Sequence, residues 1–184
     1  VRCAYASMTH VGGGGANAKK QNQDAFFVAR CGTDALVWGV LDGHGPDNGT
    51  IAAWTAARTM QAWFEAHAAQ LSASPQASMA EVFQAAHAAV RAALVDKYRA
   101  KGTPLHETAE GFLLEPDGQP CDGGTTATVV ALLQGHLLVV ANCGDSDCLL
   151  GGVLADGSIG FEQLCAFSPA PRRAHLAPTR RVRP

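Results

Sequence analysis

The chain has 184 residues, of which 47% are hydrophobic and 16% charged, so it is long and apolar enough to fold around a core of its own. Its formal net charge of −2 argues against a broad electrostatic attraction to nucleic acid or to an anionic membrane surface. The apolar runs are only as long as strands, which argues against a membrane-spanning segment.

The six cysteines are scattered, with no C-x-x-C pair and no histidine cluster at zinc-finger spacing, which argues against a structural zinc site. Cys31, Cys143 and Cys148 lie in or beside apolar strand patterns, and we expect them to be small buried side chains. No signal peptide is recognised at the N-terminus. Together these features predict an intracellular protein, cytoplasmic or nuclear, with reduced thiols.

The first half of the chain predicts strands followed by two helices. Residues 1–10 are expected to form a strand, and two β-rich runs over 25–30 and 36–41 predict a hairpin. The pattern becomes helical from Thr50 to about Leu71. A second helix is expected to start at Ser74–Pro75, or a turn later at the Ser78–Glu81 capping box, and to end near Gly102.

The second half returns to strands. After a surface excursion over residues 105–123, strands at 125–133 and 137–141 give the strongest hairpin signal. We expect a further strand pair around Gly151-Gly152 (148–150 with 153–154), and then a turn at Asp156-Gly157 with a run at 159–164. Residues 166–184 are rich in Pro and Arg and predict a disordered tail, which leaves 1–165 as the folded domain. Strand runs that do not alternate with helices favour an α+β fold with antiparallel sheets and helices on a face.

The segment with the most chemical information is Asp42-Gly43-His44-Gly45, which follows a buried strand directly. A carboxylate at the end of a stiff strand has a fixed position, and Gly43 allows its carbonyl to face the same point. Carboxylate and carbonyl oxygens are the ligands that Mg²⁺ and Mn²⁺ prefer. His44 adds a group able to donate a proton near neutral pH. A simple tight turn is an equally good interpretation of this tetrapeptide alone.

Two other segments carry acids near predicted strand ends. Lys19 and Lys20 precede Asp24 at the entrance of a strand, where an acid suits a metal and a lysine suits a phosphate, although an exposed charged loop is commoner. Asp145 follows the later hairpin in a glycine-containing turn, where it could equally cap its own backbone.

Taken in order, the words N-Q-D-A-F, V-L-D-G-H-G, G-G-T-T-A-T and A-N-C-G-D-S resemble those of the PPM family of metal-dependent protein serine/threonine phosphatases. The resemblance covers about residues 4–164 and implies an antiparallel β-sandwich flanked by helices. It also implies a two-metal centre, with Mn²⁺ or Mg²⁺, that hydrolyses phosphoserine and phosphothreonine esters of a phosphoprotein substrate.

The resemblance also implies a role for individual residues. Asp42 is expected to bridge both metals, the Gly43 carbonyl to bind one of them, and Asp24 to bind the metal or its waters. Asp145 resembles the acid that helps to hold an additional metal, and His44 the general acid for the leaving oxygen. Lys19 or Lys20 occupies the region in which the family places a cation for the substrate phosphate.

The pattern departs from the family after Leu164, because the words that supply two further metal-binding aspartates have no match. The sequence therefore predicts an incomplete, N-terminal part of the domain that binds metal weakly and hydrolyses little. The alternative function is a catalytically weak, phosphatase-like module that acts by binding a partner or a phosphopeptide.

Overall fold

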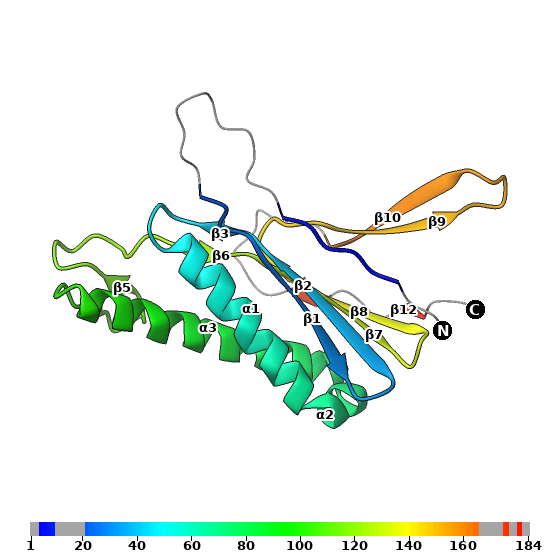
Figure 1. Ribbon diagram of the computed structural model, residues 1–184, viewed down its shortest axis with the longest axis horizontal. Coiled ribbons are helices and arrows are strands. Elements are labelled where there is room, and N and C mark those ends of the chain that lie inside the picture. The colour runs from blue at the N-terminus through cyan, green and yellow to red at the C-terminus, as the bar shows by residue number, and fades with distance from the viewer. Residues whose placement is uncertain (1–3, 10–20, 166–174, 177–179, 182–184) are drawn as a thin grey trace.

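The computed structural model describes residues 4–9, 21–165, 175–176 and 180–181 of the chain (Figure 1). Within them it has three helices, α1 (Gly49–Ala66), α2 (Ala68–Ala73) and α3 (Pro75–Ala100). The long strands are β1 (Ala25–Cys31), β2 (Ala35–Leu41), β7 (Ala127–Leu133), β8 (Leu137–Cys143), β9 (Cys148–Val153) and β10 (Ile159–Cys165). Short strands are β3 (Gly43–His44), β4 (His106–Glu107), β5 (Leu113–Leu114), β6 (Gly124–Thr125), β11 (His175–Leu176) and β12 (Arg180–Arg181).

The main sheet is antiparallel, with its long strands in the order β1-β2-β7-β8. Strands β1 and β2 pair from Ala25 with Leu41 to Cys31 with Ala35, and β7 and β8 pair from Ala127 with Cys143 to Leu133 with Leu137. Both hairpins that the sequence predicts are therefore confirmed. The central contact of the sheet, β2 with β7, joins strands that are separated by the whole helical segment.

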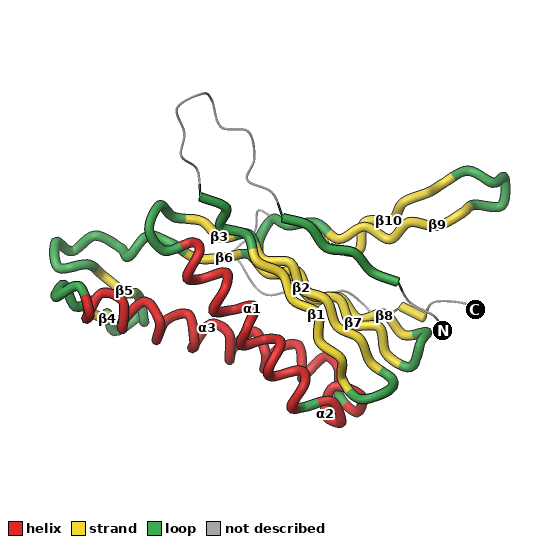
Figure 2. Tube along the Cα trace, in the orientation of Figure 1, coloured by secondary structure: helices red, strands yellow, loops and turns green. Residues whose placement is uncertain are grey.

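One face of the sheet is covered by α1, with α3 packed behind it (Figures 1 and 2). The strands turn alternate residues toward these helices, as the period of two requires, and those residues are buried. Helix α1 presents a row of small residues to the sheet, which lets the helix approach closely: Ala52, Ala53, Ala56 and Ala57. Larger side chains such as Phe27, Met60 and Phe64 fill the remaining space, so the core lies between this sheet face and α1.

The α+β class with an antiparallel sheet and flanking helices is confirmed. The second layer of the expected sandwich, however, is not formed by the part of the chain that the structure describes. The sheet face turned away from the helices instead carries partly exposed apolar side chains, with Phe26 37% and Val40 55% exposed. On this face the ring of Tyr5 packs edge-on against Trp38, with 6.4 Å between ring centroids.

Two predicted elements are wrong near the N-terminus and in the first helix. Residues 4–9 of the expected first strand have no regular secondary structure, while the rest of that strand lies outside the described residues. The helix expected from Thr50 to Leu71 breaks at His67, whose backbone leaves the helical region (φ −117°, ψ 33°). Its ring stacks on Trp63, and the bend allows Leu71 of α2 to become fully buried.

The strand pair expected around Gly151-Gly152 is also wrong. Both glycines lie inside β9, which continues to Val153 and pairs with β10 as a separate two-stranded ribbon. The chain turns instead at Asp156-Gly157, where Asp156 accepts the Ser158 N–H (2.9 Å) and Gly157 has a φ of +83° that favours glycine. Figure 1 shows this ribbon projecting from the body of the molecule.

The segment at 166–184 was expected to be a disordered tail. Two pieces of it lie within the described residues, where His175–Leu176 and Arg180–Arg181 pair with β8. The rest of that segment is outside the described residues, so the boundary of the domain at residue 165 stays a prediction. In the described part of the chain, no helix has the length and apolar content of a membrane span.

Candidate active site

The candidate site is built where strands of the main sheet end. Strand β2 stops at Leu41, Asp42 follows, and the chain continues into β3, which pairs with β6 through Gly43 with Thr125 and His44 with Gly124. The D-G-H-G segment is therefore an extended strand continuation and not the simple tight turn that was the alternative. Segments that are about 80 residues apart in sequence meet at this point.

Hydrogen bonds fix the backbone of Asp42 from the side of β6. Its N–H donates to Thr126 Oγ1 at 3.0 Å, while its carbonyl accepts from the Thr126 N–H at 2.9 Å and from Thr125 Oγ1 at 3.1 Å. The small, hydroxyl-bearing residues of G-G-T-T-A-T thus hold the strand end that carries the carboxylate. Because the backbone has little freedom left, the Asp42 side chain starts from a defined position.

Close backbone packing explains the glycines of this region. A Cβ on Gly43 would come within 2.4 Å of the Gly49 carbonyl oxygen and 2.6 Å of the Gln23 carbonyl oxygen. A Cβ on Gly124 would come within 2.8 Å of the His44 ring, which therefore lies directly over this glycine. The glycines allow three segments to approach within van der Waals contact.

The electrostatic environment of Asp42 connects three of the predicted site residues. Loss of water around its carboxyl raises the pKa of Asp42 above its ordinary value, although the residue as a whole is exposed. The negative charges of Asp24 and Asp145 raise the pKa further, as does a side-chain hydrogen bond with Asp24, whereas His44 lowers it. The fold thus brings Asp24, Asp145 and His44 within electrostatic reach of Asp42.

The Asp24 side chain lies at the start of β1 in a half-buried position. Its N–H donates to Asn22 Oδ1 at 3.0 Å, which sets the entry of the chain into the strand. The Asp24 carboxyl is near enough to that of Asp42 to raise the pKa of Asp42. Lys19 and Lys20, the residues expected to contact the phosphate, lie outside the described residues.

A network of hydroxyl and amide groups positions the loop that carries Asp145. The Ser146 carbonyl accepts from Thr128 Oγ1 at 3.0 Å and from Asn142 Nδ2, and the Ser146 hydroxyl bonds Thr126 Oγ1 at 2.7 Å. This network ties the A-N-C-G-D-S segment to G-G-T-T-A-T. Among the hydrogen bonds of the described residues, none joins Asp145 to its own turn, so the capping alternative finds no support there.

The donor set at these strand ends fits a divalent cation only in part. Among the described residues, no group of three or more His, Cys, Asp or Glu side chains is close enough to hold a metal ion. Asp24 and Asp42 do gather, and Asp145 adds charge; after desolvation, the repulsion between these acids is the next cause of the raised pKa of Asp42. Mg²⁺ is commonly held by one or two carboxylates with water in its remaining positions, and such a site is compatible with this pair.

Asn48, at the start of α1, is an organising residue that sequence reasoning missed. It is 1% exposed, and its Nδ2 donates to the Asp122 carbonyl at 2.5 Å and to Tyr98 Oη at 3.3 Å. Its Oδ1 accepts from Lys97 Nζ at 2.6 Å. One side chain thus joins α1, α3 and the segment leading into β6. The signal in the sequence was a helix-start Asn, but its partners are 49 to 74 residues away and no local pattern predicts them.

The fold resembles that of solved bacterial serine phosphatases. One bacterial serine phosphatase, carrying an arginine-to-alanine substitution, matches with a TM-score of 0.54 and 18% identity over 90% of this chain and 66% of that chain. A bacterial serine phosphatase with an arginine-to-glutamate substitution matches with a TM-score of 0.52 and 19% identity, over 90% of this chain and 67% of that chain. The serine/threonine phosphatase Stp1 from Staphylococcus aureus matches with a TM-score of 0.47 and 18% identity, over 82% of this chain and 49% of that chain. The chain thus spans about half to two thirds of the length of these structures.

These features define a chain with the α+β architecture of the PPM phosphatases and acids gathered at its strand ends. The family model for protein phosphatase 2C matches residues 39–156, which is more than half of the chain. The chain therefore belongs to the protein phosphatase 2C family. No curated protein matches it.

Proposed function

We propose that the protein to which this chain belongs hydrolyses phosphoserine and phosphothreonine esters on proteins, with the help of Mn²⁺ or Mg²⁺. Membership of the protein phosphatase 2C family supports the reaction class. The observation that carries the site assignment is the position of Asp42 at the end of β2, where Thr125 and Thr126 hold its backbone; desolvation and the nearby charges of Asp24 and Asp145 raise the pKa of its carboxyl there. Clustered acids with perturbed pKa values at strand ends are typical of functional sites.

In this proposal Asp42 and Asp24 are the anionic ligands of a divalent cation, with the Gly43 carbonyl as a neutral ligand and Asp145 as a further source of charge. When bound, such a cation lowers the pKa of a coordinated water and neutralises charge on the phosphoryl oxygens. Two cations, as the family resemblance implies, require ligands beyond those gathered in the described residues.

The remaining roles belong to side chains around the carboxylates. His44 lies over Gly124 and within electrostatic reach of Asp42, where it can donate a proton to the seryl or threonyl oxygen that leaves. Threonine side chains of β6 and the residue after it hold the backbone of Asp42 during the reaction. Lys19 or Lys20 supplies the cation for the substrate phosphate.

The test measures phosphate release from a phosphothreonine peptide, with Mn²⁺ and after chelation, for the chain and for two variants. Asp42→Asn keeps the shape of the side chain and removes its charge, and we expect at least about a 100-fold loss of metal-dependent release. Asp34→Asn is the matched control, because Asp34 precedes the opposite end of the same strand and is exposed. Release that persists unchanged after chelation, or in Asp42→Asn, contradicts the proposal.

A further inference from the structure

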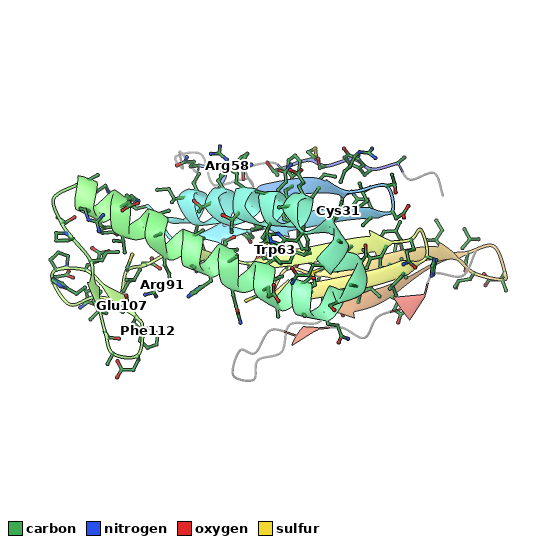
Figure 3. The ribbon with its side chains drawn as sticks, turned by 90° about the horizontal axis from the view of Figure 1, so that it is seen from below. Cys31, Arg58, Trp63, Arg91, Glu107 and Phe112 are labelled. Carbon is green, nitrogen blue, oxygen red and sulfur yellow. The ribbon has the colours of Figure 1, made fainter. Side chains whose placement is uncertain are left out.

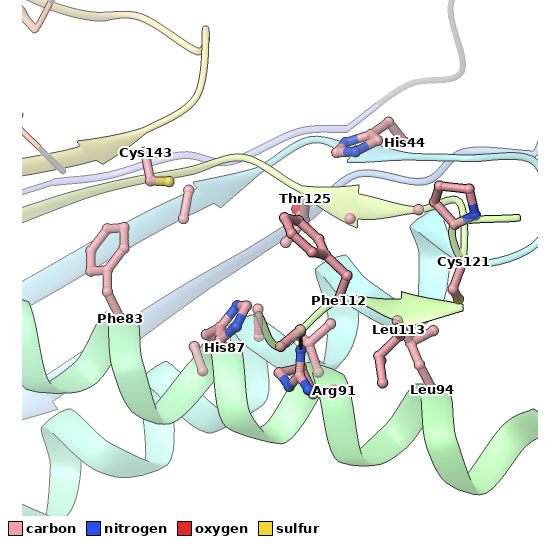
Figure 4. Close-up of a pocket in the computed structure, with 18 of the residues that line it drawn as sticks. His44, Phe83, His87, Arg91, Leu94, Phe112, Leu113, Cys121, Thr125 and Cys143 are labelled. Carbon is pink, nitrogen blue, oxygen red and sulfur yellow. Dashed lines mark hydrogen bonds between the residues drawn. The ribbon is translucent and has the colours of Figure 1, made fainter. Parts of the chain in front are cut away.

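A pocket of about 550 Å³ lies next to the candidate active site, between α3, the segment that follows it and the start of the sheet. Its walls are mainly apolar, with Phe83, Val90 and Leu94 from α3 and Phe112 and Leu113 from the segment opposite. Figure 4 shows the rings of Phe83, His87 and Phe112 around one open space, with His44 and Thr125 on the side of the sheet. Pockets that accept organic ligands have this size and this composition.

His44 connects the pocket with the carboxylates. It lines the pocket, and it is also close enough to Asp42 to lower the pKa of that carboxyl. Thr125 likewise lines the pocket and donates to the Asp42 carbonyl. If a phosphoester lies at the carboxylates with its leaving oxygen at His44, the peptide that carries this oxygen therefore lies at the mouth of the pocket.

The far wall of the pocket is held in place by Arg91. Its guanidinium pairs with Glu107 at 2.8 Å and donates to the Gly111 carbonyl, so the segment that carries Phe112 is anchored to α3 (Figure 3). Phe112 lines the pocket and is 65% exposed, so its ring is accessible to a ligand that enters from solvent. The charged side chains of the lining are Arg91, which Glu107 pairs, and Glu110, so the apolar walls and not a net charge set the preference of the pocket.

We infer that this pocket binds an apolar or aromatic side chain of the phosphopeptide substrate, next to the phosphorylated residue, with Phe112 as a specificity-determining residue. The inference rests on the proposed phosphatase function and adds to it a preference for the residue that flanks the phosphate.

The test uses phosphothreonine peptides in which one Phe moves through the two positions on either side of the phosphothreonine in a glycine background. Binding to the chain with Mn²⁺ is followed by fluorescence anisotropy. We expect one Phe position to improve affinity by about tenfold over the all-glycine peptide, because burial of part of an aromatic ring contributes a binding free energy of this size. Phe112→Ala should abolish this preference. Phe161→Ala is the matched control, since Phe161 is 72% exposed on the distant ribbon and should leave the preference unchanged.

Hydrolysis of para-nitrophenyl phosphate separates the two proposals, because this substrate has no flanking residue. Metal-dependent hydrolysis of this compound that is lost in Asp42→Asn and retained in the control Phe161→Ala supports the phosphatase function independently of the pocket. Equal affinity for all peptides, a preference that survives Phe112→Ala, or equal losses in Phe112→Ala and Phe161→Ala overturn the inference on the pocket. Absence of hydrolysis, together with a preference that depends on Phe112, contradicts hydrolysis by this chain itself and leaves a phosphopeptide-binding site.

A second observation, independent of the pocket, concerns Cys148 and Cys165 at the base of the β9–β10 ribbon. The two residues are direct partners in the antiparallel register, next to a bulge, and both are free thiols. Directly opposite residues in such a pair have Cβ atoms at separations that approach those of a disulfide. The Cys165 thiol also points to the Ser146 carbonyl at 3.8 Å, in the loop that carries Asp145.

The structure assigns Cys148 and Cys165 as a pair that a peroxide converts into a cross-strand disulfide. Burial raises the pKa of the Cys148 thiol, so the step calls for alkaline pH, at which the Cys148 thiolate attacks the peroxide and gives a sulfenic acid and, once the released hydroxide has regained the proton, water. The Cys165 thiol then attacks this sulfur and releases a second water, so that two electrons pass from the sulfurs to the peroxide and both thiol protons end in water.

The test treats the folded chain with hydrogen peroxide and then cleaves it after acidic residues, which separates the two cysteines at Asp156 and Glu162. We expect a loss of about 2 Da and two fragments that stay linked until a reductant is added. Cys148→Ser should remove the link, whereas Cys121→Ser, a half-buried thiol elsewhere, should retain it. A link to any other cysteine, or thiols that remain free while the exposed Cys143 is oxidised, overturns the assignment.

Discussion

Replacing Asn48 by alanine tests whether one buried amide holds together the elements that carry the site. The substitution removes the hydrogen bonds to Asp122 and Tyr98 and the charged bond from Lys97. At about 1 kcal/mol for each neutral bond and somewhat more for the charged one, the free energy of unfolding should fall by about 3 kcal/mol. Lys97 keeps a second acceptor, the Asp47 carbonyl, which argues against a larger loss.

Thermal and urea unfolding measure this loss. For a chain of this size, about 3 kcal/mol corresponds to a decrease of roughly 10 °C in Tm. Gln61→Ala is the control, because its hydrogen bond to Glu65 lies at the surface of the same helix, and its loss should cost less than about 0.5 kcal/mol.

The variant Asn48→Asp separates bridging from helix capping. Aspartate is as good a residue at a helix start as asparagine, and the Asn48 side chain makes no capping hydrogen bond. Aspartate nevertheless replaces the donor that faces the Asp122 carbonyl with an acceptor, so we expect a loss similar to that of alanine. A loss below about 1 kcal/mol in Asn48→Ala, or full stability in Asn48→Asp, refutes the reasoning.

Three further predictions concern the metal-free chain. The pKa of Asp42 is raised in the folded state, so ionisation of this carboxyl favours unfolding as the pH rises above the ordinary pKa of 3.8. Asp42→Asn should therefore raise Tm at pH 7 in the presence of a chelator, and an unchanged Tm would contradict the sign of the effect. Gly43→Ala should destabilise the fold by more than about 2 kcal/mol in urea unfolding, because its Cβ meets backbone at 2.4 Å, whereas Gly152→Ala, with no atom within 4 Å, should be nearly neutral. Burial, with a smaller effect of a nearby acid, raises the pKa of Cys31 to about 11, so iodoacetamide at pH 8 should label the exposed Cys143 well before Cys31, as followed by mass spectrometry.

Much of the fold was predictable because its signals are local. The β-rich runs at 25–30 and 36–41 with the short turn between them, and the Gln134-Gly135 turn, predict two hairpins without reference to the rest of the chain. The break at His67 and the continuous strand through Gly151 depend on tertiary contacts instead. For the same reason Cys143, expected to be buried, is exposed at the end of β8, and Cys148 is only half-buried, while Cys31 is buried as expected.

The candidate site divides in the same way. The sequence indicates which acids follow strands, since Asp42 and Asp145 stand directly after apolar runs or their turns. It does not indicate how these ends are held, because Thr126, Asn142 and Asn48 act through partners that are distant in sequence. Their side chains are ordinary loop and strand residues until the sheet order β1-β2-β7-β8 brings the segments together.

The sheet explains why acids that repel one another stay together. Asp42 could relieve its unfavourable contact with Asp24 by moving away, but hydrogen bonds to Thr125 and Thr126 fix its backbone and Gly43 is packed against two carbonyl groups. This repulsion contributes to the raised pKa of Asp42 after the larger effect of desolvation, and the rest of the fold offsets its cost. If these carboxylates hold a divalent cation, as we propose, the cation would reverse the sign of the interaction, and the arrangement that destabilises the metal-free chain would favour metal binding. Stability and metal affinity should therefore change in opposite directions when this acid is neutralised.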